Sequence, residues 1–100
     1  MGAFFLTSKA KSDLKSIAAY TQRRWGKNQR KIYAKHFDET FHMLAETPNA
    51  GTTGDFIKKG YRKFPCSSHI IFYRCLDESM IEVVRIVHRR MDAHEQLRGI

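Results

Sequence analysis

The residues most able to do chemistry stand in one run near the end of the chain, EVVRIVHRRMD, Glu82 to Asp92. An apolar, β-branched stretch ends there in His88, with Arg85 before it and Arg89 and Arg90 after it. Histidine is the usual general acid or base near neutral pH, and arginine holds phosphate oxygens. The run therefore fits either a reaction centre for a phosphodiester or a basic rim that holds another macromolecule.

A metal-free ribonuclease needs a base, an acid and cations around the phosphorus. Arg62 and Arg85 could supply the cations, and His88 one titrating group. Glu82 lies six residues before His88, about 20 Å away at roughly 3.3 Å per strand residue, which is too far for concerted proton transfer. Tyr73 is a possible partner, but a strand tyrosine more often packs. We therefore treat the catalytic set Arg62, Arg85 and His88 as the minority alternative and expect no catalytic residue.

Composition predicts a single domain over residues 1–100 with a charged partner. The apolar fraction is 42%, enough for one modest core, and the formal net charge is +8. The excess charge stands in clusters with interleaved apolar residues, QRKIYAK, KKGYRK and RIVHRR, rather than in a tail. Such a surface attracts nucleic acid, an acidic protein or anionic lipid.

Several classes of protein are disfavoured. The longest apolar runs, such as AFFL and IIFY, are far shorter than the roughly 20 residues of a membrane span, and the start lacks the features of a signal peptide. We therefore expect a cytoplasmic protein without membrane contact. No Cys-x-x-Cys or His-x-x-x-His spacing suggests a metal, so we expect neither a metal nor a cofactor.

Apolar spacing predicts a helical hairpin at about residues 8–47. Thr7 or Ser8 offers the first N-cap, Gly26 the helix end and Asn28 the second N-cap. The apolar stripes share helical spacing: Ala10, Leu14, Ile17, Ala18, Thr21 and Trp25, then Tyr33, Phe37, Phe41 and Leu44. A β-meander of three strands (60–66, 69–76 and 80–88) and a short strand at 4–6 complete a β-α-α-β-β-β fold, an α+β domain with the hairpin on one face of an antiparallel sheet.

The turn CSSH sets the expected strand register. It places Arg62 opposite Tyr73 and Cys66 opposite His69, and it keeps Cys66 too far from Cys75 for a disulfide. Alternation along the last strand separates two sets: Ile81, Val83, Arg85 and Val87 on one side, Val84, Ile86 and His88 on the other. With Arg85 facing outward, Val84 and Ile86 would point to the core and His88 nominally inward. The face without helices would remain open to a partner.

Five segments in this order resemble the ParE branch of the RelE/ParE toxin superfamily, the toxins of bacterial type II toxin–antitoxin pairs: LTSKAKSDLKSIAAYTQRRWG with the following KNQ, LAETPNAG, GYRKFPCSSHIIFYR and IEVVRIVHRRMD. The resemblance runs from about Phe4 to Asp92. It implies the fold above, poisoning of DNA gyrase with DNA cleaved, and neutralisation by a ParD-type antitoxin. DNA would be contacted only indirectly, through antitoxin or gyrase.

Ribonuclease cousins make the alternative concrete. RelE-type and YoeB-type toxins cut messenger RNA on the ribosome, and Arg62 and Arg85 match by position arginines that they place around the scissile phosphate. His88 lies near their terminal Tyr or His. For the binding interpretation, an acidic antitoxin tail would contact a common set of residues: Arg62, Tyr73, Arg85, His88, Arg89 and Arg90. The terminal part MDAHEQLRGI of segment 89–100 is expected to contribute to gyrase contact.

Overall fold

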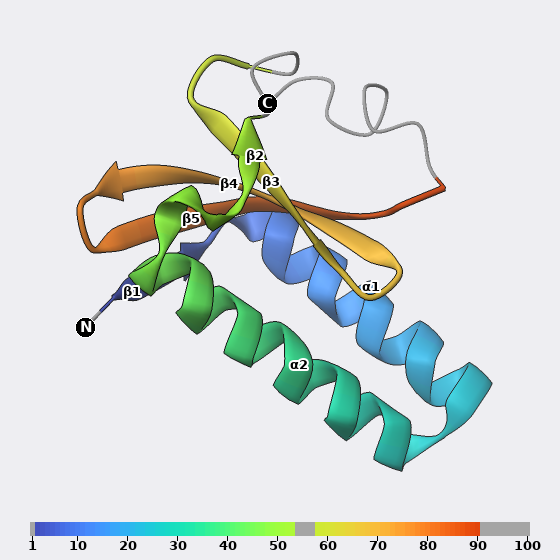
Figure 1. The fold of residues 1–100 in the computed structure, drawn as a ribbon. Coiled ribbons are helices and arrows are strands. Elements are labelled where there is room, and N and C mark those ends of the chain that lie inside the picture. Colours follow the sequence, from blue (N-terminus) through green and yellow to red (C-terminus); the bar gives the residue numbers. More distant parts are fainter. Residues whose placement is uncertain (1, 54–57, 91–100) are drawn as a thin grey trace.

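A helical hairpin covers one face of a five-stranded sheet in this computed structural model, which describes residues 2–53 and 58–90 (Figure 1). The elements follow in the order β1 (Ala3–Leu6), α1 (Ser8–Trp25), α2 (Lys27–Glu46), the short 3-10 helix η1 (Pro48–Ala50), β2 (Thr52–Thr53), β3 (Tyr61–Cys66), β4 (His69–Asp77) and β5 (Met80–His88). The predicted α+β class, with helices on one face and a meander of three strands, is confirmed.

The sheet is mixed rather than wholly antiparallel. Its strand order is β1-β5-β4-β3-β2, and β1 lies parallel to β5, with Leu6 opposite Val83. The predicted register of β3 and β4 is confirmed, with Arg62 opposite Tyr73 and Cys66 opposite His69. The two-residue strand β2, which was not among the predicted strands, pairs with β3. It is too short to show the alternation that identifies a strand.

The two helices are joined through a single residue, Gly26, with a φ of +96° that favours glycine. Its N–H donates to Gln22 O, ending α1, and its carbonyl accepts from Arg30 N, starting α2. The prediction of Asn28 as second N-cap is therefore wrong, because α2 begins earlier, at Lys27. The Thr7 cap is confirmed, since its hydroxyl accepts from Ala10 N. Neither described helix combines the length and apolar character needed to cross a membrane.

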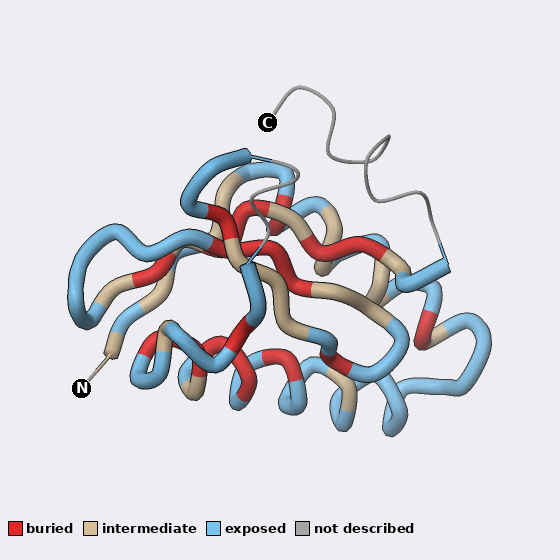
Figure 2. Tube along the Cα trace, turned by 45° about the horizontal axis from the view of Figure 1, so that its top comes forward, coloured by how far each residue is buried: buried red, intermediate tan, exposed pale blue. Residues whose placement is uncertain are grey.

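The core lies between the hairpin and the sheet (Figure 2). Its largest fully buried side chains come from α2 and from β4 and β5, and include Leu44, Ile71, Ile81 and Val83. Trp25, predicted to end the apolar stripe of α1, is instead 66% exposed. Residues 23–32, the tip of the hairpin, are all exposed, because the sheet does not extend beneath them. The hairpin tip therefore carries surface that the fold itself does not use.

A β-bulge in β5 changes which residues face the core. Phe72 pairs with Arg85 but Tyr73 pairs with Val83, so Val84 has no partner on β4. Ile81 and Val83 therefore join Ile86 in the core cluster, and the predicted alternation, which grouped them with outward Arg85, is wrong before the bulge. Val84 is buried but lies outside that cluster. The inward position predicted for Ile86 is confirmed.

Both cysteines are free, with Cys66 buried and Cys75 exposed, as their predicted separation requires. Burial raises the pKa of the Cys66 thiol, which lies 3.6 Å from the Thr40 hydroxyl. The two thiols are therefore small packing or surface groups in the described structure.

Candidate functional site

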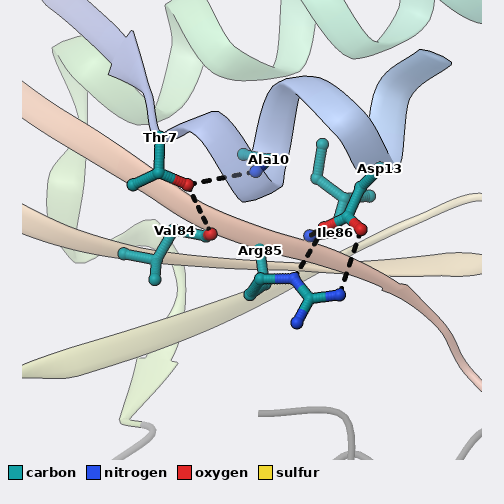
Figure 3. A network of polar contacts seen from close by, with 6 residues as sticks. All are labelled: Thr7, Ala10, Asp13, Val84, Arg85 and Ile86. Atoms are coloured by element: carbon teal, nitrogen blue, oxygen red, sulfur yellow. Dashed lines mark hydrogen bonds and ion pairs between the residues drawn. The ribbon is translucent and has the colours of Figure 1, made fainter. Parts of the chain in front are cut away.

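Arg85 is held within the fold by an ion pair with Asp13 of α1 (Figure 3). Its Nε and Nη2 donate to the two carboxylate oxygens at 2.8 and 3.0 Å, and the two side chains are only 15% and 16% exposed. This two-point geometry is the strong form of an arginine–carboxylate contact. The hydrogen bond to Asp13 raises the pKa of Arg85. Arg85, predicted to face outward to a partner, thus has a partner inside the chain.

The same helix closes the edge of β5 where β1 stops. Pairing with β1 ends at Val83, and beyond it the Thr7 hydroxyl donates to Val84 O at 2.8 Å. Asp13 then accepts from Ile86 N at 2.9 Å. The side chains of Thr7, which caps α1, and of Asp13 within it therefore replace the missing strand and satisfy backbone groups that would otherwise be unpaired. Asp13 was not predictable as a site residue, because a partner more than 70 residues away leaves no local pattern in the sequence.

Tyr73 and Arg62 fix the loop that follows the hairpin. Tyr73 is fully buried, and its hydroxyl donates to Pro48 O at 2.6 Å and accepts from Gly51 N at 3.0 Å. Arg62 Nη2 donates to Gly51 O at 2.6 Å, and burial raises the pKa of Tyr73. We call these contacts of Tyr73 and Arg62 with the loop the latch. The latch explains structurally the residues PNAG, which end the segment LAETPNAG that carries part of the family resemblance. Tyr73 presents no surface to a partner in this structure.

Tyr73→Phe should lower the free energy of unfolding by about 1–2 kcal/mol, because Pro48 O and the Gly51 N–H lose their partner. Urea denaturation measures the change. Tyr20→Phe is the matched control: Tyr20 is 56% exposed, so the change there should stay below about 0.5 kcal/mol. Equal losses in the two variants would contradict the latch.

Arg62 and Arg85 lie on opposite faces of the sheet. Arg62 pairs with Tyr73, which faces the helices, whereas Arg85 pairs with Phe72, the neighbouring residue on β4. Consecutive strand residues point to opposite faces. The alternative catalytic set of Arg62, Arg85 and His88 is therefore not brought to one point.

His88 lies beside a second histidine, His69, that was not predicted to be part of the site. His69 lies directly opposite it, with ring centroids 5.3 Å apart. The Tyr33 hydroxyl contacts His69 Nδ1 at 2.8 Å, and His88 Nδ1 accepts from Arg90 N at 3.1 Å. Burial, and then the charge of His88, lowers the pKa of His69. The inward direction predicted for His88 is confirmed by this pairing with a half-buried neighbour.

The free energy of unfolding should fall as the pH is lowered below about 6.5. His69 then binds a proton in the unfolded chain, whereas its lowered pKa keeps it neutral in the folded protein. The stabilisation is present above the unfolded pKa and is lost as pH falls toward the lower folded pKa. Chemical denaturation between about pH 5 and 7.5 checks this slope. The slope of the free energy of unfolding against pH should be shallower in His69→Gln. The control variant His42→Gln, changed on the exposed side of α2, should have the slope of the parent. The same slope in both variants would assign it to other groups.

Arg89 and Arg90 remain on the surface at the end of β5. Both are exposed, and with Ser67, Ser68 and His88 they line a hollow of about 500 Å³. The backbone is fixed there, since Arg89 N donates to Ser68 O at 2.9 Å. Of the six predicted partner-binding residues, these two arginines present the most accessible charge. The segment 91–100, expected to help contact gyrase, lies outside the described residues.

This arrangement of a helical hairpin on one face of a mixed sheet is shared with a solved structure. That structure, described as "Chromosomal ParDE TA system from P. aeruginosa", matches it with a TM-score of 0.73 at 20% sequence identity, covering 88% of this chain and 96% of that chain. At this identity the likeness establishes the fold.

Sequence comparison gives the family. The model of the "ParE toxin of type II toxin-antitoxin system, parDE" matches residues 4–93. Toxin ParE1 of Caulobacter vibrioides is 35% identical over 97% of this chain and 99% of its own length, and Toxin ParE1 of Mycobacterium tuberculosis is 36% identical over 94% and 96%. Toxin ParE of Escherichia coli is 31% identical over 97% and 94%. The chain belongs to the ParE toxin family of type II toxin–antitoxin systems, as its resemblance implied.

Proposed function

We propose that this ParE-family toxin inhibits DNA gyrase, stabilising the complex with cleaved DNA and so blocking replication in the cytoplasm. The observation that carries the proposal is that Arg62 and Arg85 are both engaged in contacts within the protein. Each is hydrogen-bonded inside the fold, and they lie on opposite faces of the sheet. Arg62 and Arg85 therefore cannot converge on one phosphorus, where cations would have to stabilise the transition state of RNA cleavage. Family membership then favours action as a protein inhibitor.

A ParD-type antitoxin is the proposed neutralising partner. A disordered tail must bury apolar surface and satisfy charges to offset the free energy of its own ordering. The exposed rim of Arg89 and Arg90, with His88 beside it, supplies cations for an acidic segment. We propose that Arg62, Tyr73 and Arg85 support this surface from within by holding the loop and the strand edge.

The alternative is a ribosome-dependent messenger RNA endonuclease of the RelE or YoeB type. One observation favours it: His69 lies beside His88, so a second titrating group is present. It would still need cations other than Arg62 and Arg85. The pair of imidazoles alone is a weaker argument, because His69 Nδ1 and His88 Nδ1 are both engaged in hydrogen bonds.

A gyrase supercoiling reaction decides between the two. Purified toxin should inhibit supercoiling and accumulate linear DNA after the protein is removed, and added antitoxin should restore supercoiling. Unaffected supercoiling, together with cutting of ribosome-bound message in a translation reaction, would contradict the proposal.

His88→Gln should keep most of the inhibition of gyrase, within about threefold of the parent, because we assign the ring a shape-giving role rather than proton transfer. General acid–base groups contribute about 10²–10⁴-fold, so loss of such a group would be conspicuous. The measurement is the toxin concentration that halves supercoiling. A hundredfold weaker variant with unchanged thermal stability would give His88 a direct part in the inhibition and contradict the shape-giving role.

A further inference from the structure

A groove of about 590 Å³ lies between the hairpin tip and the turn joining β3 to β4. Its walls are rich in rings: Tyr20, Trp25, Tyr33, His36, His69 and His88 all line it. Two of these are large exposed side chains, Tyr20 at 56% and Trp25 at 66%. No Asp or Glu is among its described lining residues. Aromatic faces left open to water in this number suit a flat ligand.

Positively charged residues lie on both sides of the groove, at the hairpin tip and at the end of β5. Between Leu14 and Phe37 the chain has seven Lys and Arg and no acidic residue. Arg23, Arg24 and Lys27 at the hairpin tip are exposed, and no ion pair involves them within residues 2–53 and 58–90. The Arg24 guanidinium lies 5.6 Å from the centre of the Trp25 ring. A polyanion near the groove would therefore meet one sign of charge.

On the side away from the hairpin tip, the groove lies next to the basic rim formed by Arg89 and Arg90. The hollow lined by Arg89 and Arg90 shares Ser67, Ser68 and His88 with the groove, so the two spaces are adjacent at the end of the sheet. Phosphate oxygens are good acceptors for arginine and for serine hydroxyls. The surface thus combines ring faces in the groove with phosphate donors at its end.

We propose that this groove binds an unpaired nucleic-acid strand, with bases stacked on Tyr20 and Trp25 and backbone phosphates held by Arg89 and Arg90. A charged groove with aromatic platforms is the general form of a single-strand site. Paired DNA fits less well, because its bases are already stacked. An acidic protein segment would use the charge but leave most ring faces without flat partners. The site goes beyond the proposed function and revises the expectation that DNA is met only indirectly.

The chain has one tryptophan, so its fluorescence reports on the groove directly. Oligothymidylate and oligouridylate of about eight nucleotides, within the usual range of single-strand sites, should each quench it at saturation. A duplex of the same length should bind more weakly, and polyglutamate of equal charge should leave the fluorescence unchanged. The tighter of the two single strands identifies the source as DNA or RNA. Equal quenching by polyglutamate or duplex would overturn the proposal and indicate an electrostatic or protein-binding surface.

Variants test the two parts separately, through anisotropy of a labelled oligonucleotide. Trp25→Ala should weaken binding about tenfold or more, since stacking on an aromatic residue contributes strongly. Phe5→Ala is the matched control, because Phe5 is 53% exposed on β1 and does not line the groove. Thermal unfolding confirms that both variants fold. Equal affinity of Trp25→Ala and the parent would overturn the stacking role.

Salt dependence tests the phosphate contacts. Arg89→Gln with Arg90→Gln should reduce the slope of log affinity against log salt by about 0.7 per lost contact with a single strand. Lys9→Gln with Lys11→Gln, two exposed lysines of α1 outside both cavities, should reduce it less. Equal slopes in the two variants would overturn the assigned phosphate site. Gyrase inhibition is measured alongside: its absence with groove-dependent strand binding intact counts against the proposed function alone.

Discussion

Asp13→Ala should lower the free energy of unfolding by about 3 kcal/mol. The change removes both hydrogen bonds to the Arg85 guanidinium and the bond to Ile86 N. Since the Arg85 side chain is only 15% exposed, it would keep its charge with little water to stabilise it. Urea denaturation at pH 7 measures the loss.

A double-mutant cycle separates the charge from the backbone bond. Arg85→Met removes the guanidinium but leaves Asp13 bonded to Ile86 N, and combining it with Asp13→Ala leaves no unpaired charge. The double variant should therefore lose less than the two single losses added together. Asp13→Asn, which keeps an oxygen for Ile86 N, should lose less than Asp13→Ala. Additive losses, or a loss below about 1 kcal/mol for Asp13→Ala, would show that the ion pair contributes little.

This ion pair also bears on how a toxin fold can change activity. By position, Arg85 matches an arginine that the ribonuclease cousins are understood to place around the scissile phosphate. Here a carboxylate from α1 forms an ion pair with it, and the same carboxylate accepts from Ile86 N at the edge of β5. A position matched by family resemblance therefore need not keep its role, because the role depends on what other elements bring beside it.

The fold was predictable where local pattern sets structure. Helical periodicity, the Thr7 cap and the CSSH turn gave the hairpin, its start and the β3–β4 register. The parallel pairing of β1 with β5 was not predicted, because four residues carry no information on their partner. The bulge at Val84 was missed for a similar reason. It depends on side chains that meet around β5 from distant parts of the chain, among them the Thr7 hydroxyl, which donates to Val84 O.

The candidate site shows the same division. His69 opposite His88 follows from a two-residue turn after Asp77, since the two register shifts in β4 and β5 cancel before the strand ends. The pairing could have been predicted from the sequence by counting residues outward from this turn along both strands. The contacts of Tyr73 and Asp13 could not, because each joins segments far apart in the chain.

Gly51→Ala should lower the free energy of unfolding by about 2–3 kcal/mol through steric overlap. Gly51 has an ordinary φ of −79°, so the backbone would accept alanine. The space would not: a Cβ would lie 2.5 Å from the Tyr73 hydroxyl oxygen and 2.6 Å from Lys63 O. The loop would have to move and release the latch formed by Tyr73 and Arg62. Thermal and urea unfolding measure the loss.

Combining Gly51→Ala with Tyr73→Phe tests this explanation, because phenylalanine removes the oxygen nearest to the new Cβ. The double variant should be more stable than the sum of the single losses predicts, by about 1 kcal/mol. Recovery should be partial, since Lys63 O belongs to the backbone of β3 and cannot turn aside. Strictly additive losses would mean that the glycine is required for another reason. Partial recovery would explain physically why this loop has a glycine three residues after Pro48: the close approach of a buried tyrosine hydroxyl on one side and a strand carbonyl on the other leaves no room for a side chain.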